Sequence, residues 1–319
     1  MDDDSGRDAV RGIARRRGML EAGRVPFPFL ARCLLSNPCR RRGHTVGRVT
    51  SRRKILRLDA GGAVRRTDTL AAEEPLDIRV GGRTLTVTMR TPGDDFDLVA
   101  GFLVAEGVVH ATRDVAALRY CAGTDDEGRN TYNVVDAALG PHVPPLAPGL
   151  QRGVWTSSAC GICGTTGVEG LRKIAPYDVA ADGLRIAPET LYALPGRLRD
   201  AQRVFDSTGG LHAAGLFDAA GELVCVREDV GRHNAVDKVV GWALREGRLP
   251  LSGHVLMVSG RASFELTQKA AMAGIPLLAA VSAPSSLAVE LAEDAGVTLV
   301  GFLRGTSANV YTHTERVAA

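Results

Sequence analysis

The chain has 319 residues, of which 45% are hydrophobic and 24% are charged, and its formal net charge is +3. This composition is typical of a globular protein with one large or two modest domains. The net charge is too small to indicate a nucleic-acid partner, and no apolar run approaches the roughly 20 residues that a membrane-spanning helix needs. Six cysteines are too few for a disulfide framework. We therefore expect a cytoplasmic protein, without nucleic-acid or membrane partners, whose thiols do catalytic or redox chemistry.

Residues 1–47 differ from the rest of the chain, because they show no sustained hydrophobic period. Arginines cluster at residues 15–17 and again at residues 40–42, among scattered prolines and glycines. This composition favours a disordered basic arm. A gene start placed too far upstream explains the same segment equally well.

Residues 48–150 are predicted to form a small N-terminal α+β domain. Short apolar alternations at residues 55–58, 76–80 and 85–89 indicate strands, and Gly81–Gly82 joins the last two as a hairpin. A helix is expected at residues 94–105, because two aspartates suit its first turn and an apolar stripe follows them. Residues 110–155 favour further strands, and the prolines between residues 141 and 148 suit a hinge or boundary.

Residues 151–319 have the rhythm of a sheet layered with helices. Helical patterns at residues 190–203, 234–246, 265–273 and 286–295 alternate with short apolar runs at residues 221–226, 255–258, 277–281 and 299–302. We therefore expect the chain to have a mixed α/β fold.

The most specific local motif is SSACGICGTTG at residues 157–167, which places Cys160 and Cys163 in a glycine-rich turn before a predicted helix. The amides and the dipole at a helix start stabilise the thiolate, which is the form that attacks sulfur. Three other interpretations stay open. The pair can be half of a zinc site, although no second CxxC is present. It can also be a reversible disulfide of the thioredoxin type, or two structurally buried thiols.

Four further motifs carry candidate site residues, of which His212 can protonate or orient a thiol group and the arginines suit an anionic ligand. They are FDSTGGLHAAG at residues 205–215 with His212, REDVGRHNAVDK at 227–238 with Arg227 and Arg232, SGRASFELTQK at 259–269 with Arg261, and GFLRGTSANVYTH at 301–313 with Arg304. Glycine-containing loops between a strand and a helix bind phosphate, and arginine adds positive charge. The competing interpretations are a core or turn histidine, salt bridges on a solvated face, and plain exposed turns. No Walker loop and no GxGxxG string is present in the sequence.

Taken in order, six strings resemble the formate dehydrogenase accessory sulfurtransferase family from about residue 49 to residue 313. They are SSACGICG, FDSTGGLHAAG, REDVGRHNAVDK, SGRASFELTQK, SAPSSLAVELAE and GFLRGTSANVYTH. The resemblance implies a sulfur carrier that accepts sulfur from a cysteine desulfurase as a cysteine persulfide. By the same resemblance, the carrier would pass the sulfur to the molybdenum or tungsten bis(molybdopterin guanine dinucleotide) cofactor that formate dehydrogenase requires. By motif, Cys160 would carry the persulfide, and Cys163 would resolve or share the sulfur.

The same resemblance implies a cofactor-binding segment near the C-terminus. It maps onto Phe302, Leu303, Arg304, Gly305, Thr306 and Ser307. To this site we add His212, Arg232 and Arg261, because cations from separate segments, Arg227 among them, can neutralise the diphosphate arms of a large ligand. The molybdenum cofactor is thus expected as a bound substrate, with no permanently bound cofactor and no metal site in the protein.

The family also implies a particular architecture and particular partners. The architecture is a cytidine-deaminase-like α/β/α layered domain at residues 151–319 beside the smaller N-terminal domain. The expected partners are the cysteine desulfurase, the formate dehydrogenase catalytic subunit and a second copy of the chain in a homodimer.

Two other functions stay open for these residues. One is a chaperone that holds the guanine dinucleotide cofactor without moving sulfur. The other is a thiol oxidoreductase with a reversible disulfide between Cys160 and Cys163. Deaminase chemistry is disfavoured, because zinc deaminases place an HxE string before PCxxC. Here the CxxC comes first, and Ala213 and Ala214 follow His212.

Overall fold

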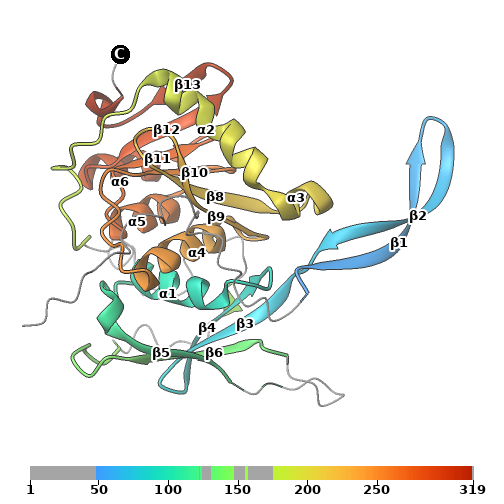
Figure 1. Cartoon of the computed structure of the whole chain (residues 1–319), viewed down its shortest axis with the longest axis horizontal. Coiled ribbons are helices and arrows are strands. Elements are labelled where there is room, and N and C mark those ends of the chain that lie inside the picture. Colours follow the sequence, from blue (N-terminus) through green and yellow to red (C-terminus); the bar gives the residue numbers. More distant parts are fainter. Residues whose placement is uncertain (1–47, 122, 124–130, 147–154, 157–174, 318–319) are drawn as a thin grey trace, which may run out of the picture. The chain divides into compact units, whose positions relative to one another are not determined.

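The computed structural model describes residues 48–121, 123, 131–146, 155–156 and 175–317, which are coloured in Figure 1. The chain divides into two units, Met1–Asn37 and Pro38–Ala319, and every described residue belongs to the second. The predicted disordered arm at residues 1–47 lies outside the described residues.

The first described strands form two separate sheets. β1 (Thr50–Asp59) and β2 (Gly62–Ala71) make an antiparallel two-stranded sheet. A five-stranded sheet has the order β5-β6-β3-β4-β7, with β3 (Glu74–Val80), β4 (Arg83–Arg90), β5 (Val115–Tyr120), β6 (Val134–Leu139) and β7 (Trp155–Thr156). The predicted hairpin is confirmed, because Gly81 and Gly82 turn β3 into β4 with positive φ angles that glycine adopts without strain.

The second half of the chain forms a six-stranded sheet in the order β13-β12-β11-β10-β8-β9. The strands are β8 (His212–Phe217), β9 (Leu223–Asp229), β10 (Val255–Val258), β11 (Leu277–Ala280), β12 (Thr298–Arg304) and β13 (Ser307–Val310). The central strands β10, β11 and β12 are parallel, and the others pair antiparallel to their neighbours. Such a sheet requires helical crossovers between its parallel strands.

Helices cover both faces of this sheet. They are α2 (Pro188–Ala201), α3 (Arg203–Thr208), α4 (Arg232–Arg245), α5 (Phe264–Met272) and α6 (Ser286–Asp294). One core cluster joins α4, α5 and α6 to the sheet, and a second joins α2 to its other face (Figure 1). The expected mixed α/β fold is therefore confirmed, whereas its likeness to cytidine deaminases stays a prediction.

The helix α1 (Asp95–Ala105) packs directly on α4 and links the two large sheets. The helices approach so closely that a Cβ on Gly101 would lie 1.8 Å from the carbonyl oxygen of Asp237. A Cβ on Gly241 would lie 1.8 Å from the carbonyl oxygen of Asp97. Only glycine allows this contact, and α4 is consequently enclosed between the six-stranded sheet and α1, as Figure 1 shows. The domain boundaries predicted at residues 47 and 150 stay predictions.

Most predicted elements occur within a few residues of their expected bounds. The helices expected at residues 94–105, 190–203, 234–246, 265–273 and 286–295 correspond to α1, α2, α4, α5 and α6. Sequence patterns did not reveal α3, β2 or β13. No helix in the described part of the chain is long and apolar enough to cross a membrane.

Candidate functional site

Several predicted site residues meet at one edge of the six-stranded sheet. The parallel strands β10, β11 and β12 end at this edge, and the antiparallel strand β8 begins there with His212. The backbone joins them, since Ser259 donates from its amide to the Ala213 carbonyl at 3.0 Å and accepts from the Ala213 amide at 2.9 Å through its hydroxyl. In open α/β sheets, ligands bind outside the carboxyl ends of the strands.

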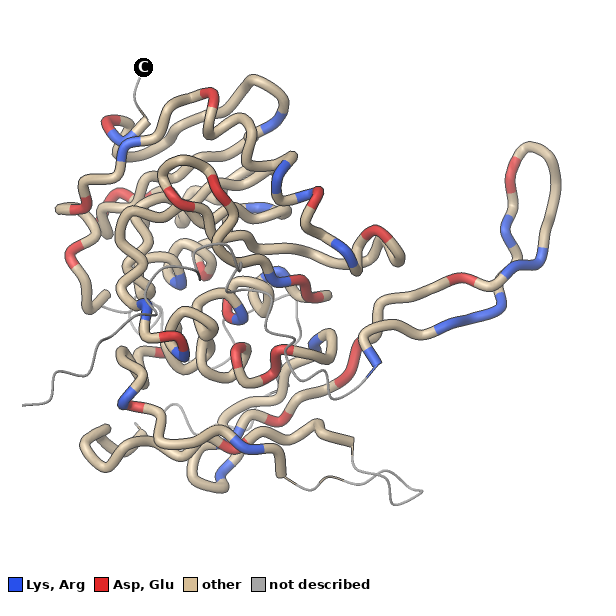
Figure 2. The backbone as a smooth tube through the Cα atoms, viewed as in Figure 1, with Lys and Arg blue, Asp and Glu red and all other residues tan. Residues whose placement is uncertain are grey.

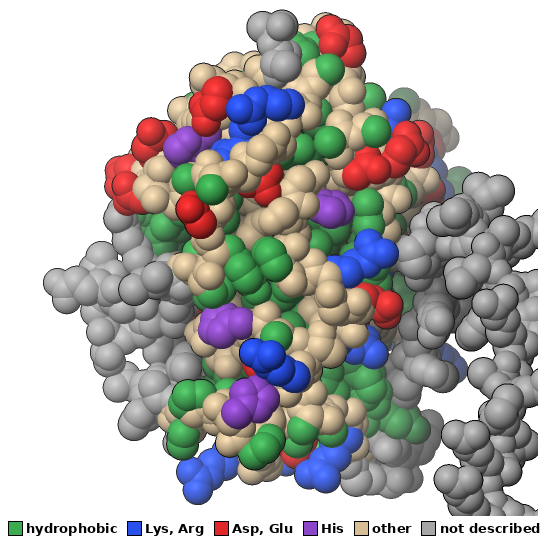
Figure 3. All heavy atoms as spheres, turned by 60° about the vertical axis from the view of Figure 1, so that its left-hand side comes forward, with side chains coloured by type: hydrophobic (Ala, Val, Ile, Leu, Met, Phe, Trp, Pro, Cys, Tyr) green, Lys and Arg blue, Asp and Glu red, His purple; other side chains and the backbone are tan. Residues whose placement is uncertain are grey.

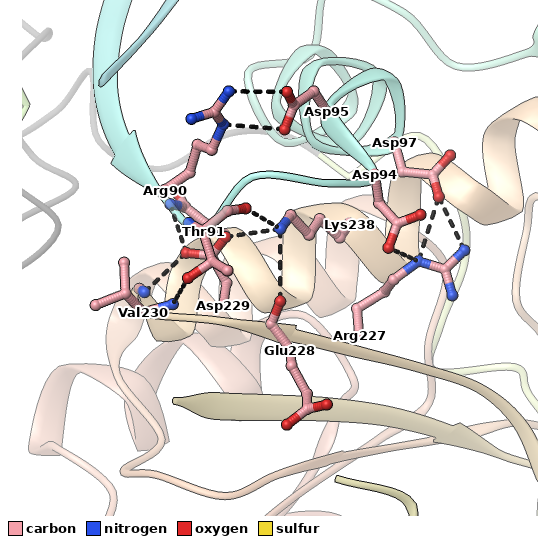
Figure 4. A network of polar contacts seen from close by, with 12 residues as sticks. Arg90, Thr91, Asp94, Asp95, Asp97, Arg227, Glu228, Asp229, Val230 and Lys238 are labelled. Carbon is pink, nitrogen blue, oxygen red and sulfur yellow. Dashed lines mark hydrogen bonds and ion pairs between the residues drawn. The ribbon is translucent and has the colours of Figure 1, made fainter. Parts of the chain in front are cut away.

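A buried carboxylate fixes the turn that enters α4 at this edge. Asp229, at the end of β9, accepts from the Gly231 amide at 2.8 Å and from the Thr91 amide at 3.1 Å. It also pairs with Lys238 at 2.8 Å, and Lys238 donates to the Thr91 carbonyl oxygen at 2.9 Å (Figure 4). This network ties the segment before α1 to the β9–α4 turn, so that the position of Arg232 is fixed by the core.

His212, Arg232 and Gly260 lie together at the centre of this edge. A Cβ built on Gly260 would be 3.6 Å from the His212 ring and 3.6 Å from the Arg232 side chain. Burial lowers the pKa of the His212 imidazole, and the nearby Arg232 and His233 lower it further. The Arg232 Nε is buried and has no hydrogen-bond partner among the described residues. A buried N–H donor of this kind calls for an acceptor, and an anionic ligand would supply one.

Three helices begin at the same edge, because each connects a strand that ends there to the next strand. They are α4 after β9, α5 after β10 and α6 after β11. Their first amides and the positive ends of their dipoles favour a negatively charged group. Ser285 caps α6 by accepting from the Ala288 amide at 3.2 Å. Arg261, in the loop before α5, is exposed at this edge.

The predicted cofactor segment forms the end of β12 and the turn into β13. Phe302 is 40% exposed and has a φ of 51°, which is rare for a bulky residue, while its amide donates to the Ser282 carbonyl at 3.2 Å. Arg304 donates from Nε to the Val281 carbonyl at 2.9 Å. Gly305 and Thr306 make the two-residue turn before Ser307.

Leu303 differs from its neighbours in this segment. It is fully buried in the second core cluster. Its side chain therefore anchors the segment in the core, and the exposed side chains on either side of it face solvent.

A pocket of about 610 Å³ opens beside this edge. Its walls include His212, Ser259 and Val281 from the strand ends, and Arg199 and Phe205 from the α2–α3 region. The Arg199 guanidinium lies 4.7 Å from the centre of the Phe205 ring, over its face. Sequence reasoning did not assign a role to either residue, although Phe205 opens the FDSTGG motif. A flat apolar and cationic wall of this kind can stack on a planar ring.

A second, smaller pocket of about 90 Å³ lies on the other side of the start of α4. His233 lines it, and its Nε2 lies 3.2 Å from the Ser263 hydroxyl and 3.7 Å from the Glu265 carboxylate. The hydrogen bond from His233 lowers the pKa of Glu265 to about 2. Lys269 pairs with Asp237 at 2.6 Å in the same pocket. The sequence motifs at residues 227–238 and 259–269 contain these residues, but they did not predict that His233, Glu265 and Lys269 share one pocket.

Arg227 does not belong to the edge. Its guanidinium pairs with Asp97 at 2.9 Å and with Asp94 at 3.5 Å (Figure 4). The salt-bridge interpretation of the charged residues at 227–238 is therefore correct for Arg227. Its ion pairs are largely buried between β9 and α1, however, and do not lie on a solvated face.

The sequence of this chain also matches a known protein family. The sequence model of the FdhD/NarQ family matches residues 71–318. The chain belongs to the FdhD/NarQ family. The resemblance inferred from the six motifs is thus confirmed, and the family match covers every element from the last residue of β2 to the C-terminal turn.

Curated members of the FdhD/NarQ family are similar over most of their length. The sulfur carrier protein FdhD of Nocardia farcinica is 59% identical over 271 residues, which are 85% of this chain and 96% of that protein. The sulfur carrier protein FdhD of Streptomyces coelicolor is 60% identical over 86% of this chain and 97% of that protein. A crystal structure of a protein described as a formate dehydrogenase accessory protein from Desulfotalea psychrophila has a TM-score of 0.65 at 24% identity, covering 85% of this chain and all of that one. That likeness supports the fold.

The motif cysteines of this FdhD/NarQ chain, Cys160 and Cys163, lie outside the described residues. The strand before them, β7, pairs in parallel with β4 so that Thr156 is opposite Thr88. Thr88 lines the pocket of His233.

Proposed function

We propose that this chain is a sulfur carrier that supplies formate dehydrogenase with a sulfurated cofactor. Three observations support this: the membership of the FdhD/NarQ family, the names of its relatives, and the CxxC motif in the sequence. In the loading step, a thiolate of Cys160 or Cys163 attacks the outer sulfur of a persulfide on a cysteine desulfurase. The donor S–S bond breaks, the donor leaves as a thiolate, and the carrier holds the sulfur as Cys–S–SH.

The sulfur acceptor is proposed to be a molybdenum or tungsten bis(molybdopterin guanine dinucleotide), bound as substrate at the sheet edge. The observation that carries this proposal is the buried, unpartnered Nε of Arg232 beside His212, at a point where three helices begin. Arg261 and Arg304 add positive charge around it, and the exposed Phe302 lies near the end of β12 with a positive φ. These groups suit the diphosphate of a nucleotide arm.

His233 is proposed as the proton acceptor for the attacking thiol. The Glu265 carboxylate lies 3.7 Å from Nε2 of its ring, and the pocket that they share also contains Thr88, which is opposite the last described residue before the cysteine motif. A neutral imidazole at this place can take the thiol proton and favour the thiolate. His233→Gln should then raise the pH midpoint for alkylation of the motif cysteines, measured by peptide mass spectrometry, whereas His254→Gln should leave it unchanged.

The loading step is tested by mass spectrometry of the intact protein after incubation with a cysteine desulfurase and cysteine. We expect one added sulfur that a reductant removes, and its loss when the carrier cysteine is replaced in Cys160→Ala or Cys163→Ala. Cys121→Ala is the matched control, because Cys121 is a partly exposed thiol outside the motif. An adduct that persists in the double variant Cys160→Ala/Cys163→Ala would contradict the proposal.

A cofactor chaperone without sulfur transfer is the second candidate, favoured because the residues proposed to bind an anion at the edge include neither motif cysteine. The double cysteine variant separates the two functions. A chaperone predicts that this variant still activates formate dehydrogenase and still binds guanosine diphosphate. A sulfur carrier predicts unchanged nucleotide binding and no activation.

A further inference from the structure

The hairpin of β1 and β2 has two chemically different faces. Residues that are directly opposite in an antiparallel pair point to the same side, and the register between these strands is regular along their whole length. One side, which we call the cationic face, carries Thr50, Arg52, Lys54, Leu56 and Leu58 of β1 with Ala63, Arg65, Thr67, Thr69 and Ala71 of β2. The other side, which we call the paired face, carries Ser51, Arg53, Ile55, Arg57 and Asp59 with Gly62, Val64, Arg66, Asp68 and Leu70.

The two faces contain equal numbers of basic residues but differ in their acids. On the paired face, Arg57 lies 3.9 Å from Asp59 and Arg66 lies 3.4 Å from Asp68. The cationic face contains no carboxylate at all, and its basic side chains make no ion pair with any described residue. Figure 2 shows the run of basic residues along β1.

The cationic face also exposes two large apolar side chains. Leu56 is 54% exposed and Leu58 is 72% exposed, and they lie beyond Lys54 toward the hairpin tip. On the face of the molecule drawn in Figure 3, by contrast, acidic and basic side chains are interspersed among apolar ones. Exposed leucines near the tip, together with uncompensated cations nearer the base, are a composition that suits a protein contact surface.

The base of the cationic face adjoins the edge site. Ala71 belongs to this face, and its Cβ lies 3.7 Å from the position of a Cβ on Gly210. Gly210 lines the pocket of about 610 Å³ that also contains His212. The helix α3, next to that pocket, contacts β2. A partner bound along the cationic face would therefore lie next to the proposed nucleotide site.

We infer that the cationic face of the β1–β2 hairpin docks an acidic protein surface that has an apolar patch for Leu56 and Leu58, next to the edge site. An isolated two-stranded hairpin is only marginally stable in water. A partner that covers its leucines would therefore stabilise the hairpin as well as the complex. Complementary charge would steer that partner and fix its register.

Charge argues against two other partners for the cationic face, the N-terminal segment of the same chain and a second copy of the chain. Residues 1–47 contain ten arginines and five acidic residues, so that segment is repelled by the cationic face. A symmetric contact between the cationic faces of two copies would bring together Arg52, Lys54 and Arg65 from each, six basic side chains without a carboxylate. An acidic partner protein is the occupant that satisfies both the charge and the leucines.

The test compares two charge-matched triple variants of the full chain. Arg52→Glu/Lys54→Glu/Arg65→Glu changes the cationic face, and Arg53→Glu/Arg57→Glu/Arg66→Glu changes the paired face by the same charge. The probes are the purified cysteine desulfurase and the purified formate dehydrogenase catalytic subunit, a choice that rests on the proposed function. Binding of each is measured by calorimetry at about 50 and about 300 mM NaCl, together with persulfide loading, circular dichroism and native mass.

We expect the cationic-face variant to bind one of the two probes about tenfold or more weakly at low salt, and the paired-face variant to bind nearly as the wild type. Leu56→Ser/Leu58→Ser should weaken the same complex at both salt concentrations, whereas Val64→Ser on the paired face should not. Salt should weaken the wild-type complex and hardly affect that of the cationic-face variant.

Other outcomes separate this inference from the proposed function. Equal binding by the two triple variants, in a chain that is still loaded with persulfide, overturns the docking face alone. Face-dependent binding without persulfide loading overturns the sulfur carrier and supports the docking face. If the native mass shows self-association and neither probe binds, the inference is overturned in favour of a second copy of the chain. If the wild type binds duplex DNA more tightly than either probe, it is overturned in favour of nucleic acid.

Discussion

Lys238 is a fully buried lysine in the middle of α4. Its ammonium group pairs with Asp229 at 2.8 Å and donates to the Thr91 carbonyl at 2.9 Å, which holds the turn before Arg232. Removal of one partner of a buried pair leaves the other charge uncompensated, at a cost of about 3–5 kcal/mol. We expect Lys238→Met to lower the free energy of unfolding by about that amount in urea denaturation. The exposed control Lys54→Met should change it by less than about 0.5 kcal/mol, and similar values for both variants would contradict the structural role.

Glu265 makes stability depend on pH through its contact with His233. The hydrogen bond from His233 lowers the pKa of Glu265 from 4.5 to about 2. A carboxyl whose pKa is lower in the folded state stabilises the fold above the pKa of the unfolded chain, and this contribution is lost as the pH falls through the folded value. The wild type should therefore exceed Glu265→Gln in unfolding free energy at pH 6, and this difference should shrink between pH 4.5 and pH 2.

The size and the cause of this difference can both be checked. Because the carboxyl is partly exposed, solvent screening limits the effect to about 1 kcal/mol. In a His233→Gln background, Glu265→Gln should produce a smaller pH-dependent difference between pH 6 and pH 2, because only the hydrogen bonds from the Glu265 backbone and Ser263 remain to lower the pKa. A difference that stays constant over this range in the wild-type background would show that the contact does not perturb Glu265.

At the scale of elements, the crossing of α1 and α4 sets the arrangement of the core. Gly101→Ala would place a methyl group 1.8 Å from the Asp237 carbonyl oxygen, and the backbone has to move to accommodate it. Overpacking costs about 1–3 kcal/mol or more, and a clash with backbone belongs at the upper end. Thermal unfolding should show a loss of at least about 3 kcal/mol. The control Gly196→Ala in α2, where nothing lies within 4 Å, should raise stability by up to about 1 kcal/mol.

The same helix pair shows how far the sequence predicts the fold. The periodic apolar residues of α4, such as Val236 and Val239, predicted a helix with one buried face, and both are fully buried. Asp237 and Lys238 belong to the polar face of that pattern, yet they are buried as well, because α1 covers this side. A single-sequence pattern does not tell which remote helix will cover a polar face, since that depends on long-range packing.

The candidate site was predictable to a similar extent. Arg232, Arg261 and Arg304 each follow a predicted strand, and strands that run in the same direction end at one edge, whereas His212 reaches this edge at the start of the antiparallel strand β8. The pocket of His233 was not predictable, because its other walls come from β4, α1 and α5. Whether Cys160 faces that pocket is set by residues outside those described, so its role stays a prediction.

At the scale of the whole molecule, the start of α4 lies between the edge site and the pocket of His233. Substitutions there should affect nucleotide binding and persulfide loading independently. Arg232 faces the edge site, while His233, the next residue, faces the pocket beside the end of β7. Arg232→Gln removes a charged donor, so we expect guanosine diphosphate to bind about tenfold or more weakly in titration calorimetry. Persulfide loading should stay at the wild-type level, because the cysteines bind sulfur covalently and the Asp229 network that shapes the turn is unchanged.

The double variant Cys160→Ala/Cys163→Ala should show the reverse result, with normal nucleotide binding and no persulfide. The exposed control Arg113→Gln should change neither measurement. If Arg232→Gln also abolished loading in a chain with wild-type circular dichroism, the two functions would share one site. Sulfur would then be accepted only by a carrier whose edge site is intact.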